Sequence, residues 1–221
     1  MQVSGISICN MESLNMIAGV KLTPGLDTER LLTLLQSAED IVMHAALYSN
    51  FASGAVDELL RDRLLGGDLK HLTLIKLEAQ SQWRDEFARI LRPGLYSEQV
   101  DELFRQSRQW CSELKLLSPT TVDLHTCQAL PLQPVMLIGD TLLAGQYAHS
   151  RHTSAEGLWL ELDTVALGLK PGTLQLWFKS GIAPEELDAS PWLIAVSRYL
   201  EECRQAAHDI WMLTPEREQA S

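Results

Sequence analysis

The chain has 221 residues, of which 46% are hydrophobic and 21% are charged, and 18 Lys and Arg against 29 Asp and Glu give a formal net charge of −11. This hydrophobic fraction is enough to bury a core, so the composition excludes a disordered tail protein, and the length fits one domain. The surplus of acidic groups argues against non-specific nucleic-acid binding, which requires Lys and Arg to neutralise phosphates.

The chain start and the cysteines predict the compartment. Residues 1–20 lack a positively charged start and are interrupted by Ser, Asn and Glu, so they do not read as a secretory signal. No apolar run approaches the roughly 20 residues that span a bilayer, and we expect a cytoplasmic protein of bacterial type without membrane association. The cysteines form no CxxC pair and have no histidine at ligand spacing, so we expect buried thiols and no metal site: Cys9, Cys111, Cys127 and Cys203.

Strand and helix patterns alternate through the first third of the chain, which is typical of an α/β fold with a mostly parallel sheet. Strands are predicted at 16–22, 41–48 and 72–77. A helix is predicted to begin after Asp27 as its N-cap. A second helix is predicted to end at Gly66-Gly67, in the C-cap position.

Residues 81–117 are predicted to form a charged helical insertion, broken once at Pro93-Gly94. Five arginines lie in this stretch: Arg84, Arg89, Arg92, Arg105 and Arg108. The ordinary interpretation is a solvated helical face with acidic partners at neighbouring turns. The alternative is an anion-binding patch, which requires the arginines to converge in space.

Strand patterns return after Val122. Two apolar runs, 134–138 and 141–145, are joined by the dipeptide Gly139-Asp140, and a two-residue turn of this kind predicts a β-hairpin. Further strands are predicted at 157–162 and 174–178, and a final helix from Ser190-Pro191 to 213. No repeat or linker divides the chain, so we expect a single α/β domain over 1–221.

The stretch PVMLIGDTLLAGQYAHS, followed by EGLWLEL, combines a strand, a turn, a second strand and a glycine loop. It resembles the active-site region of phospholipase D-like proteins, which have a His-x-Lys pair, an Asp at the turn, a Gly-Ser-x-Asn loop and a later Glu. The resemblance aligns Asp140 with the turn Asp, Gly145 with the loop glycine, His149 with the loop Asn and Glu156 with the later acid. It implies a mixed, mostly parallel sheet flanked by helices, with a concave ligand-binding surface at the strand ends.

The chain departs from the family pattern at the nucleophile. Leu132 and Pro134 stand where the family has its His and Lys. A leucine cannot attack phosphorus, and a proline cannot hold a phosphate oxygen by charge. The resemblance therefore implies the scaffold and its surface, but not the family's phosphodiester hydrolysis.

Polar residues near the predicted strand ends are the candidate site residues. His149, with Asp140 and Glu156, would supply a base and an orienting carboxylate, whereas the ordinary interpretation is a polar turn that satisfies its own backbone. His44 lies within an apolar strand, where a neutral, hydrogen-bonded core histidine is the ordinary explanation and a site residue the alternative. The remaining candidate ligand-binding residues are Tyr48, Asn50, His125, Gly145, Gln146 and Ser150.

Neither the remaining histidine–cysteine pair nor the glycine patterns of the chain predict catalysis or cofactor binding. His125 and Cys127 share one face of a predicted strand, but their side chains leave the backbone roughly 7 Å apart, so we do not expect a thiolate–imidazole pair. The chain has no G-x-x-x-x-G-K-[ST] or G-x-G-x-x-G motif, and no cofactor is predicted.

These observations favour a non-catalytic binding, regulatory or assembly module that acts with a protein partner or as a homodimer and is open to a small phosphorylated ligand. The alternative is a phosphodiesterase or nuclease whose site is rebuilt from His44, His149 and Glu156. A third interpretation is a structural subunit that docks a partner through 81–117, which an exposed apolar stripe on that segment would favour.

Overall fold

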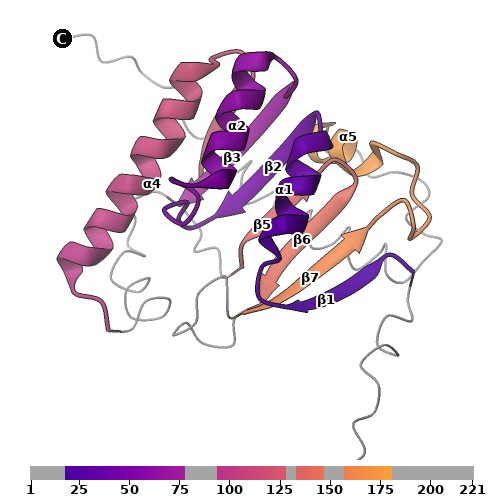
Figure 1. Ribbon diagram of the computed structural model, residues 1–221, viewed down its shortest axis with the longest axis horizontal. Helices are drawn as coiled ribbons and strands as arrows, with labels where there is room; N and C mark the ends of the chain where they lie inside the picture. Colours follow the sequence, from indigo (N-terminus) through magenta and orange to yellow (C-terminus); the bar gives the residue numbers. More distant parts are fainter. Residues whose placement is uncertain (1–17, 78–93, 128–132, 147–156, 181–221) are drawn as a thin grey trace, which may run out of the picture.

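A computed structural model of the chain describes residues 18–77, 94–127, 133–146 and 157–180. Within them, seven strands form one sheet in the order β1-β7-β6-β5-β2-β3-β4 (Figure 1). The strands are β1 (Val20–Pro24), β2 (Asp40–Ala45), β3 (His71–Leu77), β4 (Val122–Cys127), β5 (Val135–Ile138), β6 (Thr141–Gln146) and β7 (Leu158–Asp163). The helices are α1 (Thr28–Ser37), α2 (Ala55–Gly66), α4 (Ser97–Leu117) and α5 (Thr173–Ser180). The α/β class is confirmed.

The sheet has a parallel half and an antiparallel half. β2, β3 and β4 pair in parallel, whereas β2 with β5, β5 with β6, β6 with β7 and β7 with β1 pair antiparallel. The expectation of a mostly parallel sheet is therefore wrong. Parallel neighbours need a crossover connection, which α2 and α4 supply, but a two-residue turn after β5 permits only antiparallel pairing.

The two helix-end signals in the first third of the chain are confirmed, whereas the first two predicted strands have other bounds: β1 runs from Val20 to Pro24 instead of 16–22. The Asp27 carboxylate accepts a hydrogen bond from the Arg30 backbone N at 2.9 Å and caps α1. α2 ends at Gly67, whose φ of 75° lies in the left-handed region that favours glycine. The strand predicted at 41–48 stops at Ala45, because the chain turns there and the Tyr48 carbonyl accepts from the Phe51 amide at 2.8 Å.

The hairpin is confirmed, whereas the strand predicted at 174–178 is wrong. β5 and β6 pair Ile138 with Thr141 around Gly139, which has a φ of 55°. Residues 174–178 belong to α5. A short apolar window does not separate a strand from a helix, and here Leu174, Gln175 and Phe178 lie against the sheet at helical spacing.

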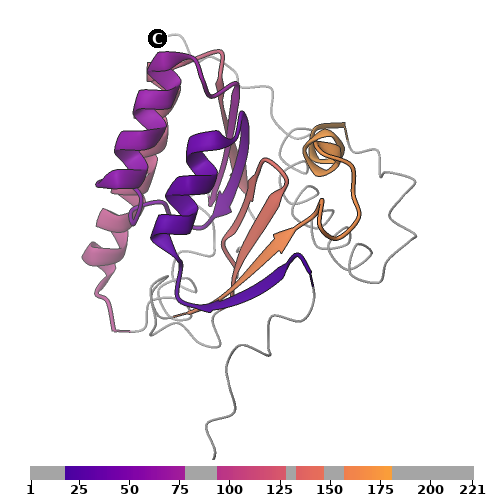
Figure 2. The same cartoon turned by 45° about the vertical axis from the view of Figure 1, so that its right-hand side comes forward.

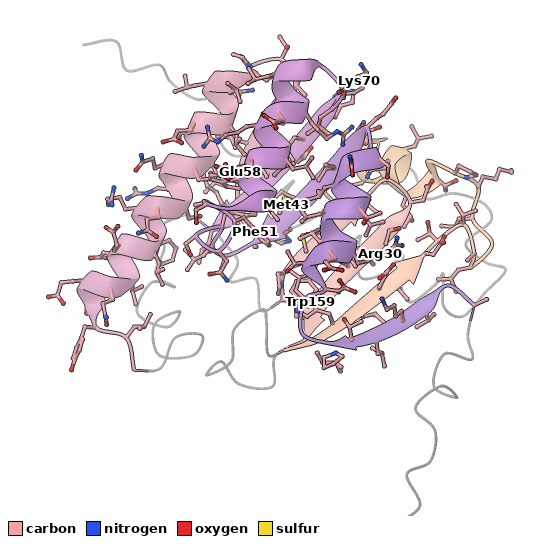
Figure 3. All side chains as sticks on the ribbon, viewed as in Figure 1. Arg30, Met43, Phe51, Glu58, Lys70 and Trp159 are labelled. Carbon is pink, nitrogen blue, oxygen red and sulfur yellow. The ribbon has the colours of Figure 1, made fainter. Side chains whose placement is uncertain are left out.

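The helices cover both faces of the sheet unequally (Figure 2). α1, α2 and α4 pack on one face, called here the three-helix face, and enclose the larger core. Met43 of β2 and Trp159 of β7, labelled in Figure 3, belong to that core. α5 lies on the opposite face, called the α5 face, where Leu174 packs with the smaller cluster that includes Leu137 and Leu162.

α4 is the crossover helix between β3 and β4, which are neighbours in the sheet. It buries one stripe against the rest of the fold: Val100, Phe104, Ser107, Trp110, Cys111 and Leu114. Residues 81–93 of the predicted insertion lie outside the described residues, as does the helix predicted from Ser190.

Candidate functional site

The structure describes part of the predicted site. His44, Tyr48, Asn50, His125, Asp140 and Gly145 are described, and so is the backbone of Gln146. Leu132, His149, Ser150 and Glu156 lie outside the described residues. The site is therefore assembled here from the strand residues.

His44 is a buried histidine whose ring has no hydrogen-bond partner within the described part of the chain. Along β2, Ile41, Met43 and Ala45 face the three-helix core, so Val42 and His44 face the α5 side. His44 is 6% exposed, and neither Nδ1 nor Nε2 has a partner among the described residues. Burial lowers the pKa of His44 to about 4, so the imidazole is neutral at pH 7.

The register of the strands gives His44 apolar neighbours. His44 lies opposite Ile75 on β3 and Val135 on β5, and Ile75 lies opposite His125 on β4. His125 therefore shares the face and row of His44 but stands two strands away, roughly 10 Å between Cα atoms. This row places no carboxylate or cation beside the His44 ring, so it does not build an acid–base pair there.

Asp140 lies at the opposite end of the sheet from His44. Its Oδ1 accepts from the Gly172 amide at 2.6 Å and its main-chain carbonyl from Thr164 Oγ1 at 2.7 Å. The adjacent Gly139 amide bonds to the carbonyl of Asp40, the first residue of β2, and His44 is four residues further on, roughly 13 Å along the strand. Asp140 holds the turn and does not join His44 in one site.

Tyr48 lies in the core, and its polar groups are used by the protein itself. The side chain is fully buried, and its hydroxyl lies 2.7 Å from the carbonyl oxygens of both Met43 and Ile75. The Tyr48 amide donates to Ser107 Oγ at 3.0 Å, and the ring packs on Trp110 with centroids 5.6 Å apart. The candidate ligand-binding role of Tyr48 therefore does not fit its buried position, whereas Asn50, within the turn, is exposed.

Gly145 is a strand residue and not the loop glycine that the resemblance implies. It is buried within β6, pairs with Trp159 of β7, and its amide donates to the Pro134 carbonyl at 2.9 Å. The ladder continues one residue further, where Gln146 pairs with Leu158. Gln146 and Leu158 bracket positions 147–157, and they lie at the end of the sheet where β2 ends.

Of the two described arginines of α4, Arg105 is paired with an acidic residue of its own helix. Arg105 donates from Nε to Glu102 at 2.8 Å, and this bond and one from Gln106 lower the pKa of the Glu102 carboxyl. The exposed large hydrophobic residues of 94–117 stand near the ends of the helix, at Leu95, Tyr96 and Leu116. The described part of the segment thus fits a solvated face and carries no continuous apolar stripe.

Metal and thiol chemistry find no support in the described parts of the chain. There, no three His, Cys, Asp or Glu side chains gather in a group able to hold a metal ion. Burial raises the pKa of the Cys111 thiol to about 12, which removes its nucleophilic form at neutral pH. Among the described helices, none combines the length and apolar character needed to cross a bilayer.

Comparisons with known proteins identify no family. No family model matches the chain, and no curated protein matches it. Among solved structures, the chain is similar to TrmBL2, an archaeal chromatin protein that binds DNA, with a TM-score of 0.36 and 9% sequence identity. The match covers 70% of this chain and 50% of TrmBL2, so the chain spans about half the length of that protein. A likeness at this level carries no argument about function.

Proposed function

We propose that the chain is a non-catalytic binding, regulatory or assembly module on a phospholipase D-like scaffold, working with a protein partner. The order of elements supports the scaffold. A buried strand, β2, lies beside a hairpin, β5–β6, and Asp140 stands at the turn of that hairpin. This is the order of strand, turn and strand on which the resemblance depends.

The surroundings of His44 are the observation that carries the non-catalytic part of the proposal. Its row neighbours are the apolar side chains of Ile75 and Val135. Pro134, where the resemblance expects a lysine, brings no charge, and its carbonyl accepts the Gly145 amide. Phosphoryl transfer needs a positive group to stabilise the charge that develops on the phosphate oxygens, and neither Ile75 nor Val135, which flank His44, supplies one.

A hydrolysis assay with matched histidine variants tests the proposal. The full chain is incubated with bis(4-nitrophenyl) phosphate and with a fluorogenic DNA substrate, beside His149→Ala and His71→Ala. His71 is exposed at the start of β3 and serves as the control. We expect the same background rate for all three proteins. Turnover that His149→Ala removes and His71→Ala leaves intact would overturn the proposal.

A phosphodiesterase or nuclease rebuilt from His44, His149 and Glu156 is the second candidate, and one observation favours it. Gln146 and Leu158, which bracket the stretch that carries His149 and Glu156, pair at the end of the sheet toward which His44 lies. This candidate requires turnover that both His44→Gln and His149→Ala remove. It also requires the acid limb of kcat/KM to fall near pH 4, because burial lowers the pKa of His44 to about 4.

A further inference from the structure

β1 is an edge strand of the sheet that the described residues form. It pairs with β7 on one side, and no strand of the described sheet lies on its other side (Figure 1). Leu22, at its centre, is 57% exposed. Unpaired main-chain groups beside an exposed apolar side chain are a template for pairing with another strand.

The hydrogen bonds to β7 show which main-chain groups of β1 are available. Asp163 N donates to Gly19 O at 2.8 Å, and Gly25 N donates to Gly157 O at 2.6 Å. Because hydrogen-bonded positions alternate along an antiparallel pair, Lys21 and Thr23 also direct their main-chain groups toward β7. The N–H and C=O groups of Val20 and Leu22 therefore point outward. Pro24 adds a carbonyl but no N–H.

The apolar side chains of this edge share one face. Val20, Leu22 and Pro24 alternate with Lys21 and Thr23 and lie on the α5 face. On the same side, the neighbouring β7 adds Leu158, which is 49% exposed, and Leu160, which is partly buried. Leu22, Pro24, Leu158 and Leu160 are called here the edge patch.

The charged side chains of the same edge lie on the three-helix face and neutralise one another. Arg30 Nη2 lies 2.7 Å from Glu161 Oε1, and Lys21 Nζ lies 3.6 Å from Asp27 and 4.0 Å from Glu161 (Arg30 is labelled in Figure 3). Two cations thus face two carboxylates in a chain whose net charge is −11. These four side chains carry no net charge together, so they do not repel the same edge of a second copy of this acidic chain.

We propose that the β1 edge pairs with the β1 edge of a second copy, antiparallel and centred on Leu22, to form a two-fold dimer. In this register Leu22 lies opposite the second copy's Leu22, and the two exchange both main-chain hydrogen bonds. Val20 lies opposite Pro24, so the missing proline N–H removes one bond of that pair and its carbonyl still accepts from Val20. The edge patches of the two copies then join across the axis.

The same register favours a second copy of the chain as the partner of the β1 edge. Lys21 lies opposite Thr23, so the dimer places no lysine against a lysine. The relation is reciprocal, as a two-fold interface requires, and it closes after one pairing because no outer edge of β1 remains free. β1 has five residues, so the contact is small and the association is expected to be weak and concentration-dependent. This surface does not depend on the proposed lack of catalysis.

The mass of the full chain in solution tests the dimer. Sedimentation equilibrium from micromolar to near-millimolar protein is expected to show a rise from 24.7 kDa toward twice that mass. Leu22→Lys is expected to weaken the association at least about tenfold, because it places like charges on the two-fold axis. Leu116→Lys is the matched control, since Leu116 is 79% exposed on α4, which packs beside β4 at the opposite end of the strand order from β1.

Hydrogen exchange at single residues tests the register. The Val20 and Leu22 amides are expected to become protected as the protein concentration rises, whereas the Lys21 and Thr23 amides, which face β7, stay protected throughout. A monomer at every concentration would overturn the proposal. A dimer that survives Leu22→Lys, or a Leu22 amide whose exchange is independent of concentration, would overturn it as well.

Discussion

His44 lies opposite Val135 across the seam between the parallel and antiparallel halves of the sheet. On its other side it lies opposite Ile75, and the ring is 6% exposed. A histidine in such a place is costly to protonate, because the interior offers the charged ring neither water nor a carboxylate in its row. The seam therefore carries a group that makes stability depend on pH.

We expect the free energy of unfolding to fall as the pH drops from about 6.5 to about 4. Burial lowers the pKa of His44 from 6.5 to about 4 in the folded chain, so in this interval the unfolded chain binds a proton that the folded chain does not. This difference in proton binding lowers the free energy of unfolding by about 3 kcal/mol between pH 6.5 and pH 4. The loss is absent above pH 6.5 and complete below pH 4.

Urea denaturation across this pH interval measures the effect. His44→Leu is expected to flatten the slope and to leave stability at pH 7 equal or higher, because it replaces two buried ring nitrogens that no described residue hydrogen-bonds with apolar atoms. His71→Leu, at an exposed position, is expected to keep the slope of the unchanged protein. A His44→Leu protein with that same slope would assign the effect to other groups.

Asp57→Ala is expected to destabilise the contact between α2 and α4. Asp57 Oδ1 accepts from Trp110 Nε1 at 2.6 Å and from Arg61 Nε at 2.8 Å, and Trp110 is 2% exposed. Leaving a buried indole N–H without an acceptor costs about 1–3 kcal/mol. Glu102→Ala removes a surface pair with Arg105 and is expected to leave stability nearly unchanged. Equal losses in the two variants would contradict this role of the indole.

Tyr48→Phe is expected to lower the free energy of unfolding by about 1–2 kcal/mol. The variant removes the hydroxyl that bridges the carbonyls of Met43 and Ile75, while the ring remains packed on Trp110. Tyr96→Phe is the matched control, since Tyr96 is 76% exposed. The two variants are compared by urea denaturation, and the expectation fails if their midpoints coincide.

Gln175→Leu is expected to loosen α5 from the sheet. Gln175 Nε2 lies 3.2 to 3.3 Å from three carbonyl oxygens, those of Asp40, Leu137 and Gly139. Its loss is expected to cost about 1–3 kcal/mol and to speed amide exchange in α5 more than in β3. Leu176→Ala, at a position 67% exposed on the same helix, is the control. Unchanged exchange in α5 would show that the helix is held by its apolar contacts.

The elements that were predicted correctly depend on chemistry between close neighbours in the chain. Asp27 caps α1 through a residue three positions away, Gly67 ends α2, and Gly139 makes the hairpin turn. These signals survive in any fold that keeps the segment intact. The strand at 174–178 failed because five apolar-rich residues fit either a strand or one face of a helix.

The candidate site was predicted less well, because its chemistry depends on which residues lie around each side chain. The burial and neutrality of His44 agree with a core histidine, but the hydrogen bond expected of such a residue has no partner among the described residues. Tyr48 is a candidate ligand-binding residue by sequence, but its side chain lies in the core. The exposure of Leu22 has no signal in the sequence, because a leucine in a predicted strand is ordinarily buried.

Capping residues, turn glycines and apolar spacing settle where this chain bends and where its helices start and stop, since each acts over a few positions. The order of the strands in the sheet depends instead on contacts between segments that are far apart in the sequence. The placement of Val135 beside His44, of Asp140 away from it, and of β1 at the margin follows from pairings between distant segments. Burial, charge state and exposure depend on those pairings, because a side chain responds to its neighbours in space and not to its neighbours in the chain.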